Sequence, residues 1–228
     1  MGIMHNENRS QHNWLIHKVN NDFMRKNLHF LRGRIFDLGC GIRPYEKDIL
    51  KYADRYIGLD WLKTQHRFCA DIVADLNHHL PLRDASADAV VSLQVLEHLS
   101  EPQTMLNEAF RILRPNKRIF LAVPFNWRVH EAPYDFFRYT RYGIEYLFKK
   151  AGFIEIDVEE ATGFWSMWVL KFNYQTAKWI RGPKSLRDVI RAFLIPLWFL
   201  DQTLAPFLDT FWPAKEETSG YFVKARKP

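Results

Sequence analysis

Residues 34–41, RIFDLGCG, together with GLD at residues 58–60, are the stretch that decides the fold. An apolar strand runs into a turn flanked by glycines, and a second strand ends on the carboxylate of Asp60. In an open parallel sheet, ligands bind beyond the carboxyl ends of the strands, and glycines there let the backbone approach a ligand closely. A carboxylate at the end of the second strand can accept hydrogen bonds from both hydroxyls of a ribose. The pair predicts a pocket for a nucleoside cofactor.

Composition indicates one globular domain with an elaboration, since the 228 residues are 47% hydrophobic and 25% charged. Cys40 and Cys69 form no disulfide framework and no CxxC motif, so nothing points to an oxidising compartment. The polar N-terminus lacks the apolar core of a signal peptide, and Asn6 breaks the myristoylation pattern, so we expect a cytoplasmic protein. The net charge of +6 permits nucleic acid or an anionic membrane surface as a partner.

Apolar periodicity predicts strands that alternate with helices. The expected strands cover residues 34–36, 56–59, 68–76, 87–93, 117–123, 153–159 and 219–226. The expected helices lie within residues 10–30, after Pro44, at 101–113 and at 141–151. This alternation is typical of a doubly wound, Rossmann-like α/β sheet.

Residues 164–215 break that pattern. They hold five of the eight tryptophans, and seven Lys/Arg against three Asp give a net charge of +4. Residues 192–212 are strongly apolar, but the uninterrupted run is far shorter than the ~20 residues that a membrane span needs. That run is broken by Pro196, Asp201, Pro206 and Asp209.

Basic residues that precede a Trp/Phe/Leu-rich stretch suit helices lying in a membrane interface, as in a peripheral membrane protein on the cytoplasmic face. A cap over the active site and a dimer surface are the alternatives. We therefore divide the chain into a cofactor-binding core with an N-terminal helix (1–163), an aromatic and basic helical insertion (164–215) and the last strand of the core (216–228).

Five blocks, in order, resemble the class I S-adenosylmethionine-dependent methyltransferases of the type 11 group. They are DLGCG at 37–41, Asp60, ADL at 74–76 with LPLRD at 80–84, VLEHL at 95–99, and EAFRILRP at 108–115. The resemblance covers about residues 30–160. It implies a seven-stranded sheet whose antiparallel last strand pairs beside strand six, with the insertion replacing a short hairpin. It also implies S-adenosyl-L-methionine as the cofactor and S-adenosyl-L-homocysteine as its product.

The resemblance implies a role for each residue on the methionine side of the cofactor. Asp37 anchors the methionine amino end. Gly39 and Gly41, with Cys40 between them, allow close backbone approach, and Gln94 lines the methionine and substrate side.

On the nucleoside side, the resemblance implies that Asp60 holds the ribose hydroxyls and that Asp75 binds the adenine amino group. Leu76 packs on the adenine ring, and Trp61 either covers it or lies in the core. Asp71 is an alternative to Asp75, since it lies one helical turn earlier.

A dinucleotide-dependent oxidoreductase is a weaker interpretation. Its fingerprint needs a third glycine, which the run from Gly39 to Pro44 lacks, and Arg43-Pro44 breaks the helix start that would receive a pyrophosphate. The methyltransferase cofactor carries no phosphate, so this departure fits it.

Glu97-His98 lies at the exit of the fourth strand. Methyltransferases of the ubiquinone pathway bind a metal at a similar exit, using an extra glutamate three residues earlier, where this chain has Gln94. Gln is a weaker ligand for a hard cation, so we expect no metal here. His98 is left as a substrate contact or as a capping and packing residue.

The string HEAPYDFFRYT at residues 130–140 follows the fifth strand. A histidine near its ordinary pKa can take a proton from a hydroxyl, so His130 is the candidate general base, with substrate binding and a structural role as alternatives. Tyr134, Arg138 and Tyr139 are candidates for binding the acceptor. Arg138 could equally clamp Asp135.

The predicted function is methyl transfer from S-adenosylmethionine to an oxygen of a small or lipid- or glycan-like acceptor. RNA methylation is one alternative, because aromatic and Arg side chains can stack bases. A catalytically silent cofactor-binding scaffold of a membrane-associated biosynthetic complex is another.

Overall fold

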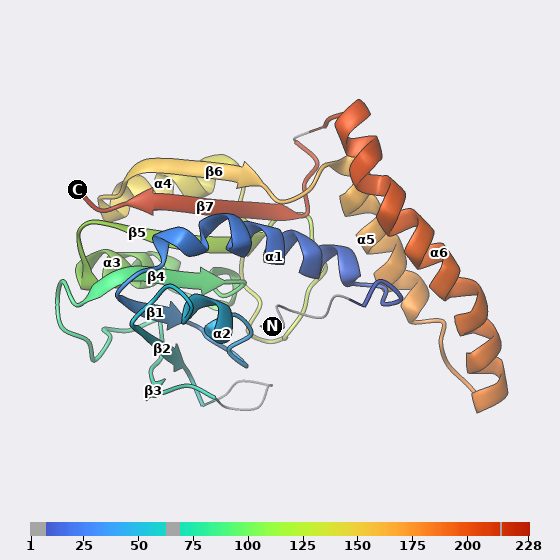
Figure 1. Cartoon of the computed structure of the whole chain (residues 1–228), viewed down its shortest axis with the longest axis horizontal. Coiled ribbons are helices and arrows are strands. Elements are labelled where there is room, and N and C mark those ends of the chain that lie inside the picture. Colours follow the sequence, from blue (N-terminus) through green and yellow to red (C-terminus); the bar gives the residue numbers. More distant parts are fainter. Residues whose placement is uncertain (1–7, 63–68, 215) are drawn as a thin grey trace. The chain divides into compact units, whose positions relative to one another are not determined.

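A mixed sheet forms the centre of the protein, which is described here from a computed structural model covering residues 8–62, 69–214 and 216–228. Its strand order is β3-β2-β1-β4-β5-β7-β6, and β7 runs antiparallel to β5 (Figure 1). The strands are β1 (Arg34–Leu38), β2 (Arg55–Asp60), β3 (Ile72–Val73), β4 (Ala87–Leu93), β5 (Leu113–Pro124), β6 (Ile154–Glu160) and β7 (Gly220–Arg226). The predicted seven-stranded α/β fold with an antiparallel last strand is confirmed.

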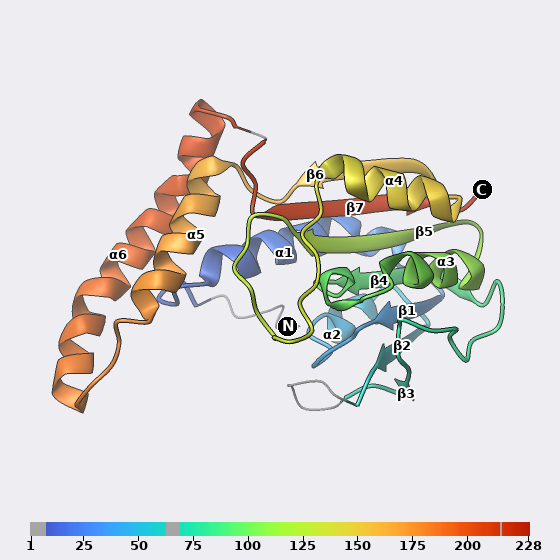
Figure 2. The same cartoon turned by 180° about the vertical axis from the view of Figure 1, so that it is seen from behind.

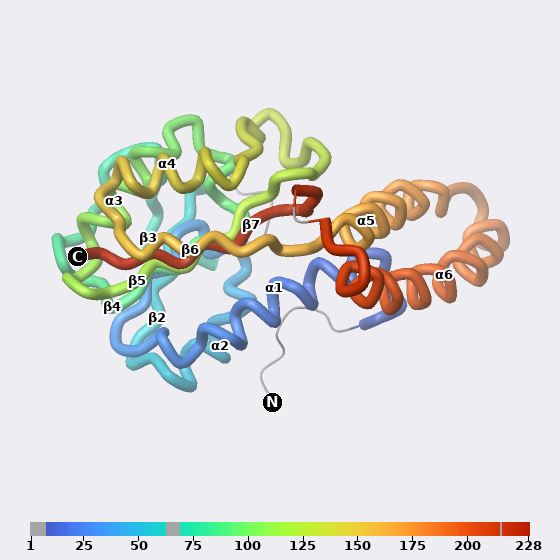
Figure 3. Tube along the Cα trace, turned by 90° about the horizontal axis from the view of Figure 1, so that it is seen from above, coloured from blue at the N-terminus to red at the C-terminus, as the bar shows by residue number. Residues whose placement is uncertain are grey.

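Helices cover both faces of this sheet, with α3 and α4 on one face and α2 on the other (Figure 3). The helical segments are α1 (Trp14–Asn27), η1 (Leu28–Phe30), α2 (Glu46–Ile49), η2 (Leu96–His98), α3 (Pro102–Ile112), α4 (Arg141–Ala151), α5 (Phe164–Ala177) and α6 (Lys184–Phe211). Because both faces are covered, the central strands β1 and β4 are buried over most of their length, as expected for parallel strands.

The chain forms two compact units. The first contains the sheet and comprises, among the described residues, Met24–Glu159 and Gly220–Pro228; the second comprises the described residues up to Phe23 together with Glu160–Ser219. This grouping differs from the predicted domains, because the first part of α1 belongs with α5 and α6. The physical link is Gln202 of α6, whose amide accepts from the Leu15 backbone N–H at 2.9 Å and donates to the Gln11 carbonyl at 3.0 Å.

Helix α4 shows how closely local sequence sets an element's ends. The side chain of Thr140 accepts a hydrogen bond from the Gly143 N–H at 3.1 Å, which makes it the N-cap. Gly152 ends the helix in the left-handed conformation, at a φ of 98°. The predicted helix at 141–151 is confirmed.

Several predicted boundaries are wrong. Strand β3 has only two residues instead of the expected 68–76, because the Asp75 carboxylate accepts from the Asn77 N–H and turns the chain; Phe68 lies outside the described residues. Strand β5 begins at Leu113, four residues earlier than expected, since Leu113 pairs with Ala87 ahead of a register shift in which β5 carries the extra residues before Arg118 pairs with Ala89. The insertion is helical, and α6 continues through both Pro196 and Pro206.

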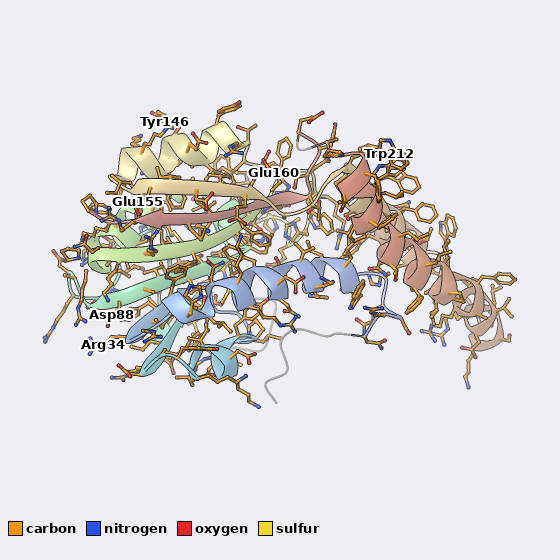
Figure 4. The ribbon with its side chains drawn as sticks, turned by 45° about the horizontal axis from the view of Figure 1, so that its top comes forward. Arg34, Asp88, Tyr146, Glu155, Glu160 and Trp212 are labelled. Atoms are coloured by element: carbon orange, nitrogen blue, oxygen red, sulfur yellow. The ribbon has the colours of Figure 1, made fainter. Side chains whose placement is uncertain are left out.

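Asp88 joins the amino ends of β1 and β4 at the sheet edge away from the glycine turn. Its carboxylate accepts from the Arg34 N–H at 2.9 Å and pairs with Arg114 at 2.7 Å (Figure 4). Burial acts to raise the pKa of Asp88, but these two donors hold it below its ordinary value. The strands are thereby aligned, so their opposite ends meet at one rim.

In the second unit, α5 and α6 pair along their lengths. Asp209 of α6 caps the start of α5, since its carboxylate accepts from the backbone N–H groups of Trp165 at 2.8 Å and Ser166 at 3.2 Å. The indole of Trp198 donates to the hydroxyl of Thr176 at 3.0 Å. Among the helices that the structure describes, none is long and apolar enough to cross a membrane.

Candidate active site

The glycine turn after β1 is bonded directly to the end of β2. The N–H groups of Gly39 and Cys40 donate to the Leu59 carbonyl at 2.9 and 3.0 Å, and the Gly41 N–H donates to Oδ2 of Asp60 at 2.8 Å. Gly39 and Gly41 have φ values of +79° and +51°, where an L side chain is strained. These bonds place the two motifs of the sequence side by side.

Asp60 presents a fixed carboxylate at this rim. Its Oδ1 accepts from the Trp61 N–H at 2.8 Å while Oδ2 holds Gly41, so both oxygens are oriented by backbone donors. Each carboxylate oxygen keeps a second lone pair, and the side chain is only half-buried. The carboxylate is therefore an available acceptor for a pair of neighbouring hydroxyls, as the sequence predicts.

The space around the turn fits a bound nucleoside cofactor. A Cβ added to Gly41 would meet no atom within 4 Å, so that side of the backbone is open. A Cβ on Gly39 would instead lie 2.4 Å from Val95 of the segment after β4. Gly39 thus allows two strand ends to close together, while Gly41 leaves its backbone accessible to a ligand.

Asp37 lies in β1 and is buried. Its carboxylate accepts from the hydroxyl of Tyr56 on β2, and burial raises its pKa to about 7. Burial also raises the pKa of the Cys40 thiol to about 12, so Cys40 stays protonated and its predicted role is limited to its backbone. A cationic group beside Asp37, such as the predicted methionine ammonium, would favour the ionised carboxylate.

The carboxylate of Asp71 already has partners within the protein. It accepts from the Gly58 N–H at 2.8 Å and pairs with Arg43 at 2.9 Å, and Arg43 also pairs with Glu46 at 2.8 Å. Asp71 thus fastens the glycine turn to β2, which leaves Asp75 as the better candidate for the adenine contact.

The remaining predicted cofactor residues occupy different environments. Asp75 is exposed just beyond β3, with Oδ1 accepting from Asn77. Leu76 is buried in the core of the sheet. Gln94 follows β4 at a φ of 58°, half-buried, with its N–H donating to the Ala122 carbonyl at 2.8 Å. Their contacts with the cofactor stay predictions.

The loop from β5 to α4, yellow-green in Figure 2, lies beyond the carboxyl ends of β4 and β5. Asp135 organises it: the carboxylate accepts from the His130 N–H at 2.8 Å and pairs with both terminal nitrogens of Arg138 at 2.6 and 2.7 Å. Arg138 also donates to the carbonyls of Trp127 and Arg128. The hydrogen bonds of Arg138 therefore hold the loop together. This is the alternative given in the sequence analysis, in which Arg138 clamps Asp135.

Of the two tyrosines predicted to bind the acceptor, only one faces the rim. Tyr139 is buried and its hydroxyl donates to the Leu96 carbonyl at 2.9 Å, so that prediction is corrected to a structural role. Tyr134 is half-buried and its ring meets Trp61 edge-on, with ring centroids 4.8 Å apart. This contact joins the loop after β5 to the end of β2.

His98 and His130 come together although 32 positions separate them. Their ring centroids are 4.8 Å apart, and Glu97 lies between them, with Oε1 3.7 Å from His98 Nε2 and 4.0 Å from His130 Nε2. We call these three residues the Glu97 cluster. Glu97 was not predicted from the sequence as a site residue, for which the Glu97-His98 pair was the available signal. Asp135 was also not predicted as the partner of His130, for which the spacing within the HEAPYD string was the available signal.

Comparison with known proteins agrees with this geometry. A methyltransferase domain family matches residues 36–121. Over 104 residues the chain is 36% identical to a protein of Mycolicibacterium smegmatis named a probable S-adenosylmethionine-dependent methyltransferase, covering 42% of this chain and 40% of that protein. The chain thus spans less than half the length of this curated relative.

Solved structures share the fold. The [4+2]-cyclase SpnF gives a TM-score of 0.60 at 18% identity, covering 92% of this chain and 81% of that one. A Haemonchus contortus phosphoethanolamine N-methyltransferase in complex with S-adenosyl-L-methionine gives 0.57 at 16% identity, covering 97% and 58%. The chain therefore matches a methyltransferase domain family over residues 36–121 and shares the fold of S-adenosylmethionine-dependent methyltransferases. Since one neighbour is named a cyclase, this methyltransferase fold does not by itself define the reaction.

Replacing Asp60 with Asn should weaken S-adenosylhomocysteine binding by about 10- to 100-fold, because a charge-assisted hydrogen bond is worth ~1.5–3 kcal/mol. Calorimetric titration of both proteins measures this. Asp54→Asn is the matched control, because Asp54 is an exposed aspartate just before β2. Equal affinities in Asp60→Asn and the wild type would remove Asp60 from the cofactor site.

Asp37→Asn should make the protein more stable relative to the wild type as pH rises. The folded pKa of Asp37, about 7, lies above the unfolded value of 3.8, so ionising it in the fold costs stability progressively between these pH values. Between pH 5.5 and 8 the difference in unfolding free energy should grow by about 2 kcal/mol in favour of Asn. The growth occurs between pH 5.5 and the folded pKa of about 7, at about 1.36 kcal/mol per pH unit. Urea unfolding at both pH values tests this, and a difference independent of pH would contradict it.

Proposed function

We propose that this methyltransferase transfers the methyl group of S-adenosylmethionine to a hydroxyl oxygen of an amphipathic, lipid-linked acceptor. The observation that supports an oxygen acceptor is the placement of a neutral imidazole, His130, at the rim where β4 and β5 end. When bound, the cofactor supplies a methyl group on a positively charged sulfur, which is already activated for transfer. Asp37, Gly39, Gly41, Asp60 and Asp75 are the residues that would hold it.

A hydroxyl acceptor must lose a proton during transfer, and His130 can take it. Burial and the neighbouring His98 lower the pKa of His130 below its ordinary value, so the ring is neutral near pH 7. Its Nδ1 lies 3.3 Å from Oδ2 of Asp135 and 3.5 Å from Nη2 of Arg138. The tautomer that carries its proton on Nδ1, facing the carboxylate, leaves the lone pair of Nε2 free to take the acceptor's proton. The Arg138 pair holds the pKa of Asp135 well below its usual range, so Asp135 stays ionised. An amine acceptor would need no such base before attack.

His130→Gln should lower turnover about 100- to 1,000-fold, the usual contribution of a general base, while S-adenosylhomocysteine binding changes less than twofold. Transfer of a radiolabelled methyl group to a lipid extract measures turnover, and calorimetry measures binding. His29→Gln is the matched control, because His29 is an exposed histidine of η1. Full turnover in His130→Gln would rule out His130 as the catalytic residue.

The lipid-linked acceptor is supported by one face of α6. Large apolar side chains recur along it every three or four residues, which places them on one stripe of the helix. All are exposed, Phe193 by 77% and Phe207 by 60%: Leu186, Val189, Phe193, Leu197, Leu200, Leu204, Phe207 and Phe211. The opposite stripe, with Leu194, Trp198 and Ala205, is the buried one.

Charge at one end of this face suits an anionic lipid surface. Residues 178–191 contain five basic residues and one acidic residue, Asp188. A helix whose apolar stripe lies in the headgroup region and whose basic residues contact anionic lipids binds such a surface from one side. We therefore place this methyltransferase peripherally on an anionic membrane, where a lipid-linked acceptor would be found.

Phe193→Glu should weaken binding to vesicles containing 30% anionic lipid by about 3- to 100-fold in a flotation assay, because the variant places a charge in the membrane interface. Ala192→Glu is the matched control, since Ala192 is the adjacent exposed residue and lies outside the stripe. Equal flotation of the two variants would contradict the lipid surface. Loss of a dimer in Phe193→Glu, measured by light scattering, would assign the stripe to a second copy instead.

A further inference from the structure

Glu97 is the least satisfied charged group of the described residues near the rim. Its side chain is fully buried, and neither carboxylate oxygen has a hydrogen-bond partner. A buried carboxyl group without a partner costs several kcal/mol in an apolar medium, and the fold retains it at the exit of β4. A ligand bound to this carboxyl group would offset that cost.

His98 presents a lone pair to Glu97. Its Nδ1 lies 2.6 Å from the Tyr134 carbonyl, which can only accept, so Nδ1 carries the proton. In the neutral ring Nε2 is then unprotonated, and this is the nitrogen that lies 3.7 Å from Glu97 Oε1. A histidine that donates one ring N–H to a backbone carbonyl and offers the other nitrogen is the usual arrangement of a metal ligand.

His130 offers its Nε2 in a similar way. Its Nδ1 faces the Asp135 carboxylate at 3.3 Å, and Asp135 is itself held by Arg138 at 2.6 Å. A carboxylate behind a histidine raises the basicity of the ring and fixes its orientation, as behind many metal-bound histidines. Nε2 lies 4.0 Å from Glu97 Oε1.

We propose that Glu97, His98 and His130 bind a divalent transition-metal cation, with Zn²⁺ as the best fit. One ligand atom from each residue lies within 4.8 Å of the others, in the one such group found in the described part of the chain. Ligands at ~2.0–2.1 Å from a tetrahedral cation lie about 3.4 Å apart. The distances from Glu97 Oε1 to the two histidine nitrogens, 3.7 and 4.0 Å, would shorten by about 0.3 and 0.6 Å, and the widest of the three ligand distances, up to 4.8 Å, by up to about 1.4 Å.

The donor set selects among cations. Two imidazoles and one carboxylate suit Zn²⁺, Co²⁺ or Mn²⁺, whereas Mg²⁺ and Ca²⁺ prefer sites built from oxygen. Three protein ligands leave a coordination position open, as in catalytic sites. The expectation of no metal rested on Gln94 replacing a glutamate within one segment; His130 supplies a third ligand from a separate loop.

The cation site can be tested separately from the proposed function, because cation binding needs neither cofactor nor acceptor. A bound cation would use the Nε2 lone pair of His130, which the proposed function assigns to the general base. The cation would then supply the acidity of the acceptor hydroxyl in place of His130, and the proton would leave to water. Binding measured on the protein alone therefore separates the two proposals.

The test is titration of the tag-free, full-length protein with Zn²⁺ in competition with a chromophoric chelator, together with the visible absorption of added Co²⁺. We expect one Zn²⁺ per chain with a Kd below about 1 μM, and a tetrahedral Co²⁺ spectrum. Glu97→Gln and His130→Ala should each weaken Zn²⁺ binding at least tenfold and abolish the Co²⁺ spectrum. Excess Mg²⁺ should not displace the ion.

His79→Ala is the matched control. His79 also lies 3.2 Å from a carboxylate, that of Glu108, but Glu108 is already bonded to Arg111 and to the Leu80 N–H. The Zn²⁺ affinity of the His79→Ala variant should equal that of the wild type. If Glu97→Gln does not fold, His130→Ala alone decides, since His130 is partly exposed. No stoichiometric binding, or equal binding in all variants, would overturn the proposal.

Discussion

The hydrogen bond from the Gly41 N–H to Asp60 is the constraint on which the cofactor side of the molecule depends. It crosses from the turn after β1 to the end of β2, and Trp61 completes the orientation of the same carboxylate. Because Gly41 has a positive φ and open space where a Cβ would be, the turn can make this bond and still expose its backbone. Strand alignment, held at the other edge by Asp88, ensures that β4 and β5 end at the same rim.

Most of the fold could be predicted from the sequence, because its signals are local. The helix at 141–151 carries its own cap at Thr140 and its own stop at Gly152. The length of β3 could not be predicted, since it depends on one carboxylate, Asp75, turning the chain through Asn77. The start of β5 depends on the pairing of Leu113 with Ala87 across a register shift, which no local sequence pattern indicates.

The candidate site divides in the same way. The glycine turn and Asp60 were predictable, because each belongs to a short motif at a strand end. The Glu97 cluster was not, because His130 reaches Glu97 only through the path of a loop that Asp135 and Arg138 hold. Tyr139 was predicted to bind the acceptor because it is adjacent in sequence to other candidate site residues. Its side chain instead lies in the core, where its hydroxyl donates to the Leu96 carbonyl.

Three buried or partly buried carboxyl groups in the first unit show that environment, and not residue type, decides chemistry. Asp135 has a bidentate arginine and stays ionised, so it can orient a histidine. Asp37 has one tyrosine hydroxyl, and its pKa of about 7 lets it respond to a cationic ligand. Neither oxygen of Glu97 has a hydrogen-bond partner, and burial raises its pKa to about 8. A buried carboxyl group beside two histidines carries a desolvation cost that hydrophobic packing would have avoided, and the cation that we propose would offset that cost by stabilising the ionised carboxylate.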